Sequence, residues 1–162
     1  MLLAVLEGLG LGVLLIIYCL IGIKDGAVGM VHLYDKKVQN RCVVMGLTTR
    51  EKIKKRARIF KIGGIIAYVV YALAFVYAVN GARGFLQGFL QMLILFSVCN
   101  VIDRIFVDEI WVCHTKAWII PGTEDLMPYI TAKDKVKKWI FGTVGLAIIS
   151  AALAGIMALI IK

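Results

Sequence analysis

The chain has 162 residues, of which 61% are hydrophobic, and its formal net charge is +9 at pH 7. Soluble domains contain about half apolar residues, and the apolar residues here fall into long runs with few charges, which indicates bilayer spans rather than a soluble core. The basic residues lie beside these runs, which favours anionic lipid headgroups over nucleic acid as their partner. We therefore expect one all-α membrane domain, residues 1–162, with four transmembrane helices.

The first span is predicted at residues 2–23, close to the length that a bilayer requires. It lacks the basic start and the small-residue cleavage site of a signal peptide, so we expect a retained helix. Gly8 and Gly12 form a G-x-x-x-G pattern that allows a neighbouring helix to approach closely. Glu7 is expected at the membrane interface, where its carboxylate stays hydrated, with a buried functional role as the alternative.

Residues 24–62 form a basic connector with two predicted amphipathic helices on the membrane surface, within residues 27–61. The break between them is expected at Gly46-Leu47, with Gly46 as a C-terminal cap. Thr48 and Glu51 have the spacing of a capping box for the second helix, which runs directly into the next span. We expect this connector to face lipid.

The second and third spans are predicted at residues 63–79 and 85–102, joined by a short turn at residues 80–84 into an antiparallel hairpin. An aromatic face on the second span is interpreted as packing, with its hydroxyls hydrogen-bonded to neighbours; it consists of Tyr68, Tyr71 and Phe75. Gln87 and Gln91 lie one turn apart and are expected to bond to each other or to a neighbouring helix.

The fourth span is predicted at residues 139–161, and its small residues indicate close packing, either within the chain, with a second copy or with a partner membrane protein. The repeat at every fourth residue comprises Ala147, Ala151 and Gly155, flanked by Ala154 and Ala158.

The distribution of Lys and Arg predicts the orientation in the membrane. Eleven lie in residues 24–62, one (Arg83) lies between the second and third spans, and six lie in residues 103–138. The positive-inside rule then places the two long connectors in the cytoplasm and both termini outside the cell membrane. In that reducing compartment the cysteines are expected as thiols.

Most side chains capable of acid–base or ligand chemistry lie between residues 100 and 139. Clustered carboxylates together with phosphate oxygens are ligands for hard divalent cations, and basic side chains hold phosphates, so one interpretation of this stretch is a lipid-phosphate site. The catalytic candidates are Asp103, Asp108, His114 and Glu124; the metal candidates are Asp103, Asp108, Glu124 and Asp125; the lipid- or phosphate-binding candidates are Arg104, Lys116, Lys133, Lys137 and Lys138. The alternative is that these charges neutralise one another as a surface network, beginning with an Arg104–Asp108 pair at i,i+4.

Pro121-Gly122 predicts a type II turn that reverses the chain. We expect this turn to cover the end of the bundle and to bring Glu124 or Asp125 near Asp103 or Arg104, where Arg104 neutralises only one of its neighbouring aspartates closely. A capping box is predicted to start the last helix, and three tryptophans are predicted to anchor at the membrane interface: these residues are Thr131 with Asp134, and Trp111, Trp118 and Trp139.

Residues 102–129 resemble a segment of small uncharacterised bacterial membrane proteins, in which an Asp-containing helix end precedes an aromatic stretch and a P-G-T-E turn. The resemblance implies an integral membrane protein and no particular activity. Three functions remain: a non-enzymatic membrane component that binds anionic lipid or a partner, a lipid-phosphate-modifying enzyme with a divalent cation, and an oligomeric transporter or channel. The third is disfavoured because no span has a charge near its centre. We expect the first.

Overall fold

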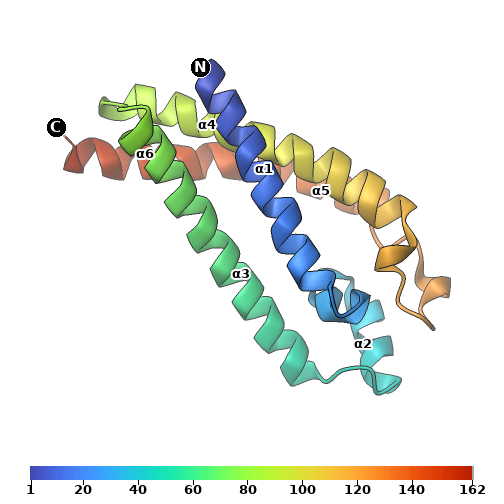
Figure 1. Cartoon of the computed structure of the whole chain (residues 1–162). Coiled ribbons are helices and arrows are strands. Elements are labelled where there is room, and N and C mark those ends of the chain that lie inside the picture. The colour runs from blue at the N-terminus through green and yellow to red at the C-terminus, as the bar shows by residue number, and fades with distance from the viewer. Residues whose placement is uncertain (162) are drawn as a thin grey trace.

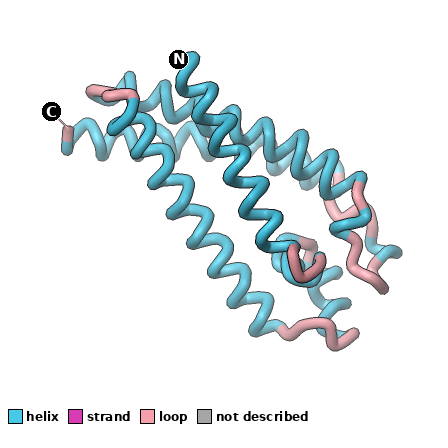
Figure 2. Tube along the Cα trace, in the orientation of Figure 1, coloured by secondary structure: helices cyan, strands magenta, loops and turns pink. Residues whose placement is uncertain are grey.

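The computed structural model describes residues 1–161, which are helices and connecting turns without any strand. Four helical rods are long and apolar enough to cross a membrane: Leu2–Ile23, Arg50–Val79, Gly84–Val112 and Ala132–Ile160. The predicted all-α, four-helix membrane protein is confirmed. Both termini and the 80–84 turn lie at one end of the molecule, the terminal end, and the two long connectors gather at the other, the connector end (Figures 1 and 2).

Three of the four rods change their hydrogen-bonding pattern along their length. The first rod is α1 (Leu2–Ile23), and the first connector holds the 3₁₀-helix η1 (Ala27–Leu33) and α2 (Lys36–Val44). The second rod is α3 (Arg50–Leu73) with π-helical η2 (Ala74–Val79), and the third is α4 (Gly84–Ile102) with π-helical η3 (Asp103–Val112). After the short η4 (Lys116–Trp118) and η5 (Glu124–Leu126), the fourth rod consists of α5 (Ala132–Ile140), π-helical η6 (Phe141–Gly145) and α6 (Leu146–Ile160). The third and fourth rods extend well beyond the spans predicted at 85–102 and 139–161.

Helix α4 is the centre of the bundle and packs against both α1 and α6. The predicted close approach at the α1 glycines is confirmed. A Cβ at Gly8 would lie 2.6 Å from Val98 Cβ, and one at Gly12 would lie 2.3 Å from Ile102 Cδ1. Gly8 therefore accepts only glycine while α1 stays this close to α4, because the Leu95 backbone oxygen also lies 2.8 Å from its added Cβ, whereas at Gly12 the Ile102 side chain would have to shift.

Helix α3 diverges from α4 beyond the turn that joins them, so the predicted hairpin does not pack along its length (Figure 1). Long side chains fill the space between the helices instead. The Tyr71 hydroxyl donates to the Glu7 carbonyl oxygen at 3.0 Å, and the Tyr68 hydroxyl lies 3.2 Å from Cys99 Sγ. These contacts agree with the packing role predicted for the aromatic face of α3.

The contact face of α6 differs from the predicted small-residue repeat. Ser150 and Ala154 are fully buried, and Gly142, one turn before α6, is also buried. Gly155 has no neighbour within 4 Å of an added Cβ, and Ala147 and Ala151 are only partly buried. The buried face therefore lies about one residue, or 100°, away from the predicted one, and it is continuous with Gly142, which packs directly against Asn100 of α4.

A second apolar core, the connector core, lies outside the bundle at the connector end. It joins η1, α2 and the start of α3 to the 118–129 segment. The Tyr34 hydroxyl donates to the Trp118 carbonyl oxygen at 2.6 Å, and Trp118 is only 2% exposed. The prediction that Trp118 is an interfacial anchor is therefore wrong, because its indole fills this core. Trp139 remains exposed.

The expected break in the first connector is confirmed at Gly46. The amide of Gly46 (φ +73°) donates to the Val43 carbonyl, and the amide of Leu47 donates to the Cys42 carbonyl, which together form a Schellman motif. The first expected surface helix is itself divided, because the Asp35 carboxylate accepts the Lys37 amide and starts α2 as a separate helix.

The second expected surface helix is the first part of α3, which continues without interruption into the span. Its N-cap is Thr49, whose Oγ accepts the Lys52 amide at 3.3 Å. The predicted capping box of Thr48 and Glu51 is therefore wrong by one residue. Thr48 is buried, so its side chain packs inside instead of capping the helix.

Candidate functional site

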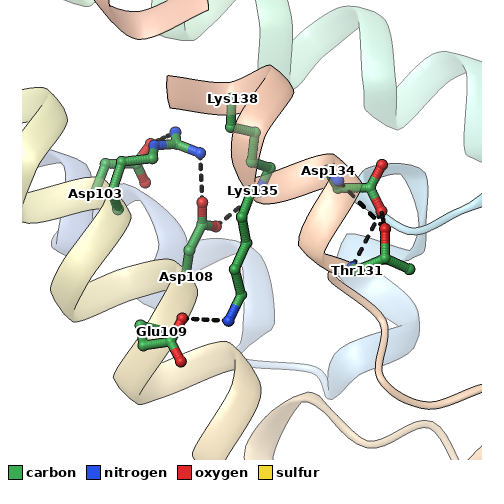
Figure 3. A network of polar contacts seen from close by, with 8 residues as sticks. Asp103, Asp108, Glu109, Thr131, Asp134, Lys135 and Lys138 are labelled. Atoms are coloured by element: carbon green, nitrogen blue, oxygen red, sulfur yellow. Dashed lines mark hydrogen bonds and ion pairs between the residues drawn. The ribbon is translucent and has the colours of Figure 1, made fainter. Parts of the chain in front are cut away.

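A network of charged side chains joins η3 to α5 at the connector end (Figure 3). Arg104 pairs with both Asp103 and Asp108, and Lys138 Nζ lies 2.8 Å from Asp108 Oδ1. Lys135 pairs with Glu109 beside them. The expectation that Arg104 neutralises only one aspartate is wrong, because the guanidinium bridges the two.

Local backbone geometry explains why both aspartates reach Arg104. The α-helical spacing of about 100° per residue places Asp103 on a different face from Asp108. From Asp103 onward the helix is π-helical, with i→i+5 hydrogen bonds and a smaller turn per residue. Asp108 therefore lies closer to the side of the helix that carries Asp103 than α-helical spacing would place it, and Arg104 contacts both carboxylates. The predicted Arg104–Asp108 pair at i,i+4 is present as well.

The lysines of the network come from α5, whose start is fixed by the predicted capping box. Asp134 Oδ2 accepts the Thr131 amide at 3.1 Å, and Thr131 Oγ accepts the Asp134 amide at 3.2 Å (Figure 3). This confirms the prediction for the last helix. The cap sets the helical register that turns Lys135 and Lys138 towards η3.

A mainly apolar cavity of about 300 Å³ lies beside this network, between the bundle and the connector core. One part of its wall is charged, with Asp103, Arg104, Asp108 and Lys138, and another is aromatic, with Tyr34, Phe60, Trp118 and Tyr129. The charged part has two anions and two cations that already pair with each other. The positive and negative charges in the cavity wall therefore neutralise each other, and no charge there is left without a partner.

The predicted type II turn at Pro121-Gly122 is present, with Gly122 at φ +83° and the Thr123 amide donating to the Ile120 carbonyl. Its carboxylates, however, stay away from the network. Glu124 accepts the Gly122 amide of its own turn, and Asp125 pairs with Arg41 of α2 at 3.0 Å. The expectation that this turn brings a carboxylate to Asp103 or Arg104 is wrong, because the turn docks on α2.

The remaining candidate residues are likewise not gathered into one site. His114 is exposed, and its Nδ1 contacts the Glu109 carbonyl oxygen. Within residues 1–161 no three His, Cys, Asp or Glu side chains lie close enough to hold a metal ion. Asp103 and Asp108 lie together, whereas Glu124 and Asp125 lie on another surface. Lys116, Lys133 and Lys137 are exposed, and none of them forms an ion pair with a described carboxylate.

The two connectors differ in how their cations are used. In residues 103–138, Arg104, Lys135 and Lys138 are neutralised by nearby carboxylates. Of the eleven Lys and Arg in residues 24–62, Arg41 alone is paired with a carboxylate of the described chain. The excess positive charge at the connector end therefore belongs mostly to the first connector, above all to residues 50–61 of α3.

Two titratable groups of the connector core are shifted by burial. Desolvation raises the pKa of Tyr34, so its hydroxyl remains a donor to the Trp118 carbonyl. Desolvation lowers the pKa of His32, and the positive charge of Arg56 lowers it further. Both ring nitrogens of His32 are buried without a hydrogen-bond partner among the described residues, which favours the neutral imidazole.

Sequence reasoning missed a polar cluster at the terminal end. Glu7 is only 7% exposed, and Asn80 Nδ2 donates both to Glu7 Oε2 at 3.0 Å and to Gln91 Oε1 at 2.9 Å. The expected hydrated position of Glu7 is therefore wrong. The sequence did contain a signal for this cluster: Glu7 is an acidic residue within an apolar span, and Asn80 is a polar residue at the turn that lies at the same end of the bundle. Among the described residues, Gln87 and Gln91 bond neither to each other nor to a neighbouring helix: Gln91 accepts from Asn80 of the 80–84 turn, and Gln87 accepts the Arg83 amide at 2.8 Å.

No family model, curated protein or solved structure matches this chain. The assignment as a multi-pass membrane protein therefore rests on the four apolar helices themselves.

Proposed function

We propose that this protein is a non-enzymatic membrane component that binds anionic lipid headgroups through the basic first half of α3. The observation that supports this most strongly is the unpaired charge described above. Seven cations in residues 50–61 form no ion pair with any described carboxylate: Arg50, Lys52, Lys54, Lys55, Arg56, Arg58 and Lys61.

The length of the helix that begins with these cations supports a position for them at the membrane surface. The rod Arg50–Val79 has 30 residues and is about 45 Å long at 1.5 Å per residue. The hydrocarbon core takes up about 30 Å, which leaves the first ten or so residues outside it. Arg50, Lys54, Arg58 and Lys61 recur at helical spacing and form a stripe that runs into the bilayer at Lys61. Each such cation near an anionic surface contributes about 1 kcal/mol.

The proposal includes an orientation, with the connector end in the cytoplasm and both termini outside the cell membrane. The gathering of both basic connectors at one end supports it, because the positive-inside rule then acts on a single face. That face meets the leaflet that holds most anionic lipid.

The lipid-binding surface proposed on α3 differs from the one predicted from the sequence, which lay in the third connector. Arg104 and Lys138 are already occupied by Asp103 and Asp108, so binding a phosphate there would break existing ion pairs. Lys116, Lys133 and Lys137 are free of such pairs but are fewer than the seven cations of α3. They serve as a matched control.

The test is a titration of purified protein in mild detergent with fluorescent short-chain phosphatidylglycerol and, separately, phosphatidylcholine. The α3 variant K54Q/R58Q/K61Q removes three charges from the stripe, and K116Q/K133Q/K137Q removes three from the third connector. We expect phosphatidylglycerol to bind the wild type more tightly than phosphatidylcholine, and the α3 variant to lose at least tenfold in affinity, with a smaller loss in the control. High salt should weaken the wild-type binding. Equal binding of the two lipids by the wild type would overturn the proposal and leave a protein partner as the occupant of this face.

A further inference from the structure

A cationic cleft lies between α2 and the first turn of α3. Its volume is about 420 Å³, and it is lined by Lys36, Arg50 and Lys54, by the amide side chain of Asn40, and by the apolar Val43 and Ile53. No carboxylate lines this cleft. Its three cations are exposed, and none is engaged by an ion pair elsewhere in residues 1–161.

Local contacts position the two walls of the cleft. The Schellman motif at Gly46 sets the angle between α2 and the chain that leads to α3, and the Thr49 cap fixes where α3 begins. Ile53 anchors α3 in the connector core, where it is 7% exposed. Arg50, one of the three cations, belongs to the first turn of α3, where amide groups without intrahelical acceptors add positive potential.

The charge of the cleft indicates the kind of anion that it accepts. Three cations with no internal counter-charge match a dianion better than a monoanion. A phosphodiester headgroup has a single negative charge, whereas a phosphomonoester has a charge of about −1.5 to −2 near pH 7 together with three acceptor oxygens. The Arg50 guanidinium, the two ammonium groups and the Asn40 amide supply donors for these oxygens.

We propose that this cleft binds a phosphomonoester group, presented by a lipid headgroup such as that of phosphatidic acid or by a soluble phosphate. The inference rests on the lipid-binding role proposed above and adds a selectivity to it. The stripe of α3 attracts any anionic lipid, and the cleft distinguishes a terminal phosphate from a bridging one.

The experiment measures the ratio of affinities for short-chain phosphatidic acid and short-chain phosphatidylglycerol in detergent. The cleft variant is K36Q/R50Q/K54Q, and the matched control is K52Q/K55Q/R58Q, which removes three charges from α3 outside the cleft. Wild type is expected to prefer phosphatidic acid, with the cleft variant losing about a hundredfold in affinity for it and showing a ratio near one. The control variant should bind both lipids more weakly but keep the wild-type ratio. The conservative variant K36R/K54R should also keep the ratio, which shows that charge rather than folding is responsible.

The outcomes separate the two proposals. A wild-type ratio of one, with both anionic lipids preferred to phosphatidylcholine, would overturn the cleft assignment and leave the lipid-binding face intact. A control variant that loses the ratio as fully as the cleft variant would also overturn the cleft. A wild type without preference for either anionic lipid would overturn the lipid-binding face itself. Where the ratio is present, displacement of phosphatidic acid by inorganic phosphate assigns recognition to the phosphate group alone, and failure to displace assigns it to the lipid headgroup.

Discussion

Replacing Gly8 by alanine tests the close contact between α1 and α4. The added Cβ would lie 2.6 Å from Val98 Cβ and 2.8 Å from the Leu95 carbonyl oxygen, whereas carbon atoms in favourable contact are about 3.5–4.0 Å apart. The Leu95 oxygen belongs to the helical backbone of α4 and cannot turn aside. Relief therefore requires α1 to move away by about 1 Å, which loosens an interface in which Leu11 is fully buried.

The magnitude follows from two opposing effects. Overpacking of this kind costs about 1–3 kcal/mol, and alanine gains up to about 1 kcal/mol over glycine within a helix. We expect a net loss of about 1–2 kcal/mol for Gly8→Ala. Gly155→Ala is the matched control, because no atom lies within 4 Å of the added methyl group.

The assay is unfolding in mixed micelles of mild detergent and dodecyl sulfate, followed by circular dichroism. Gly8→Ala should unfold at a lower dodecyl sulfate fraction than wild type, and Gly155→Ala at the same or a higher fraction. Equal stability of Gly8→Ala and Gly155→Ala would contradict the close contact between α1 and α4 at Gly8.

Three further predictions concern the connector end and the orientation. Arg104→Gln leaves two largely buried carboxylates without their shared partner and should cost about 3 kcal/mol in the same unfolding assay; an unchanged midpoint would show that the network is dispensable. The lowered pKa of His32 means that, as the pH falls, the unfolded chain binds a proton before the folded one does, so the contribution of His32 to stability should be fully present well above about pH 6.5 and fall as the pH drops through that value. His32→Gln should reduce that fall, and an identical pH profile would contradict the assignment. In whole cells, an impermeant maleimide should label Arg83→Cys but not Lys52→Cys in a Cys113→Ser background, and the reverse pattern would invert the proposed topology.

The four spans could be predicted because apolar length and local caps depend on nearby residues alone. Gly46 needs only the freedom of glycine at positive φ, and Thr131 with Asp134 needs only a three-residue spacing, so both were recognisable from sequence. Gly8 and Gly12 were recognisable for the same reason. A face of small residues indicates that another helix packs closely there, but it does not show which helix.

The site could not be predicted because it depends on contacts between distant segments and on a change of helix type. Nothing in the local sequence shows that η3 becomes π-helical at Asp103, and this change lets Arg104 bridge two aspartates. Asp125 finds Arg41, 84 residues away along the chain, instead of the end of α4. Glu7 is buried because Asn80, brought back by the α3–α4 turn, supplies its hydrogen bond.

The lipid selectivity of the reconstituted protein tests the central claim most directly. Electron paramagnetic resonance with spin-labelled phosphatidylglycerol or phosphatidylcholine measures the fraction of each lipid that the protein immobilises. We predict a larger immobilised fraction for phosphatidylglycerol, a difference that shrinks at high salt and in the K54Q/R58Q/K61Q variant. Equal immobilised fractions for the two lipids at low salt would contradict the proposal that the unpaired cations of α3 bind anionic headgroups.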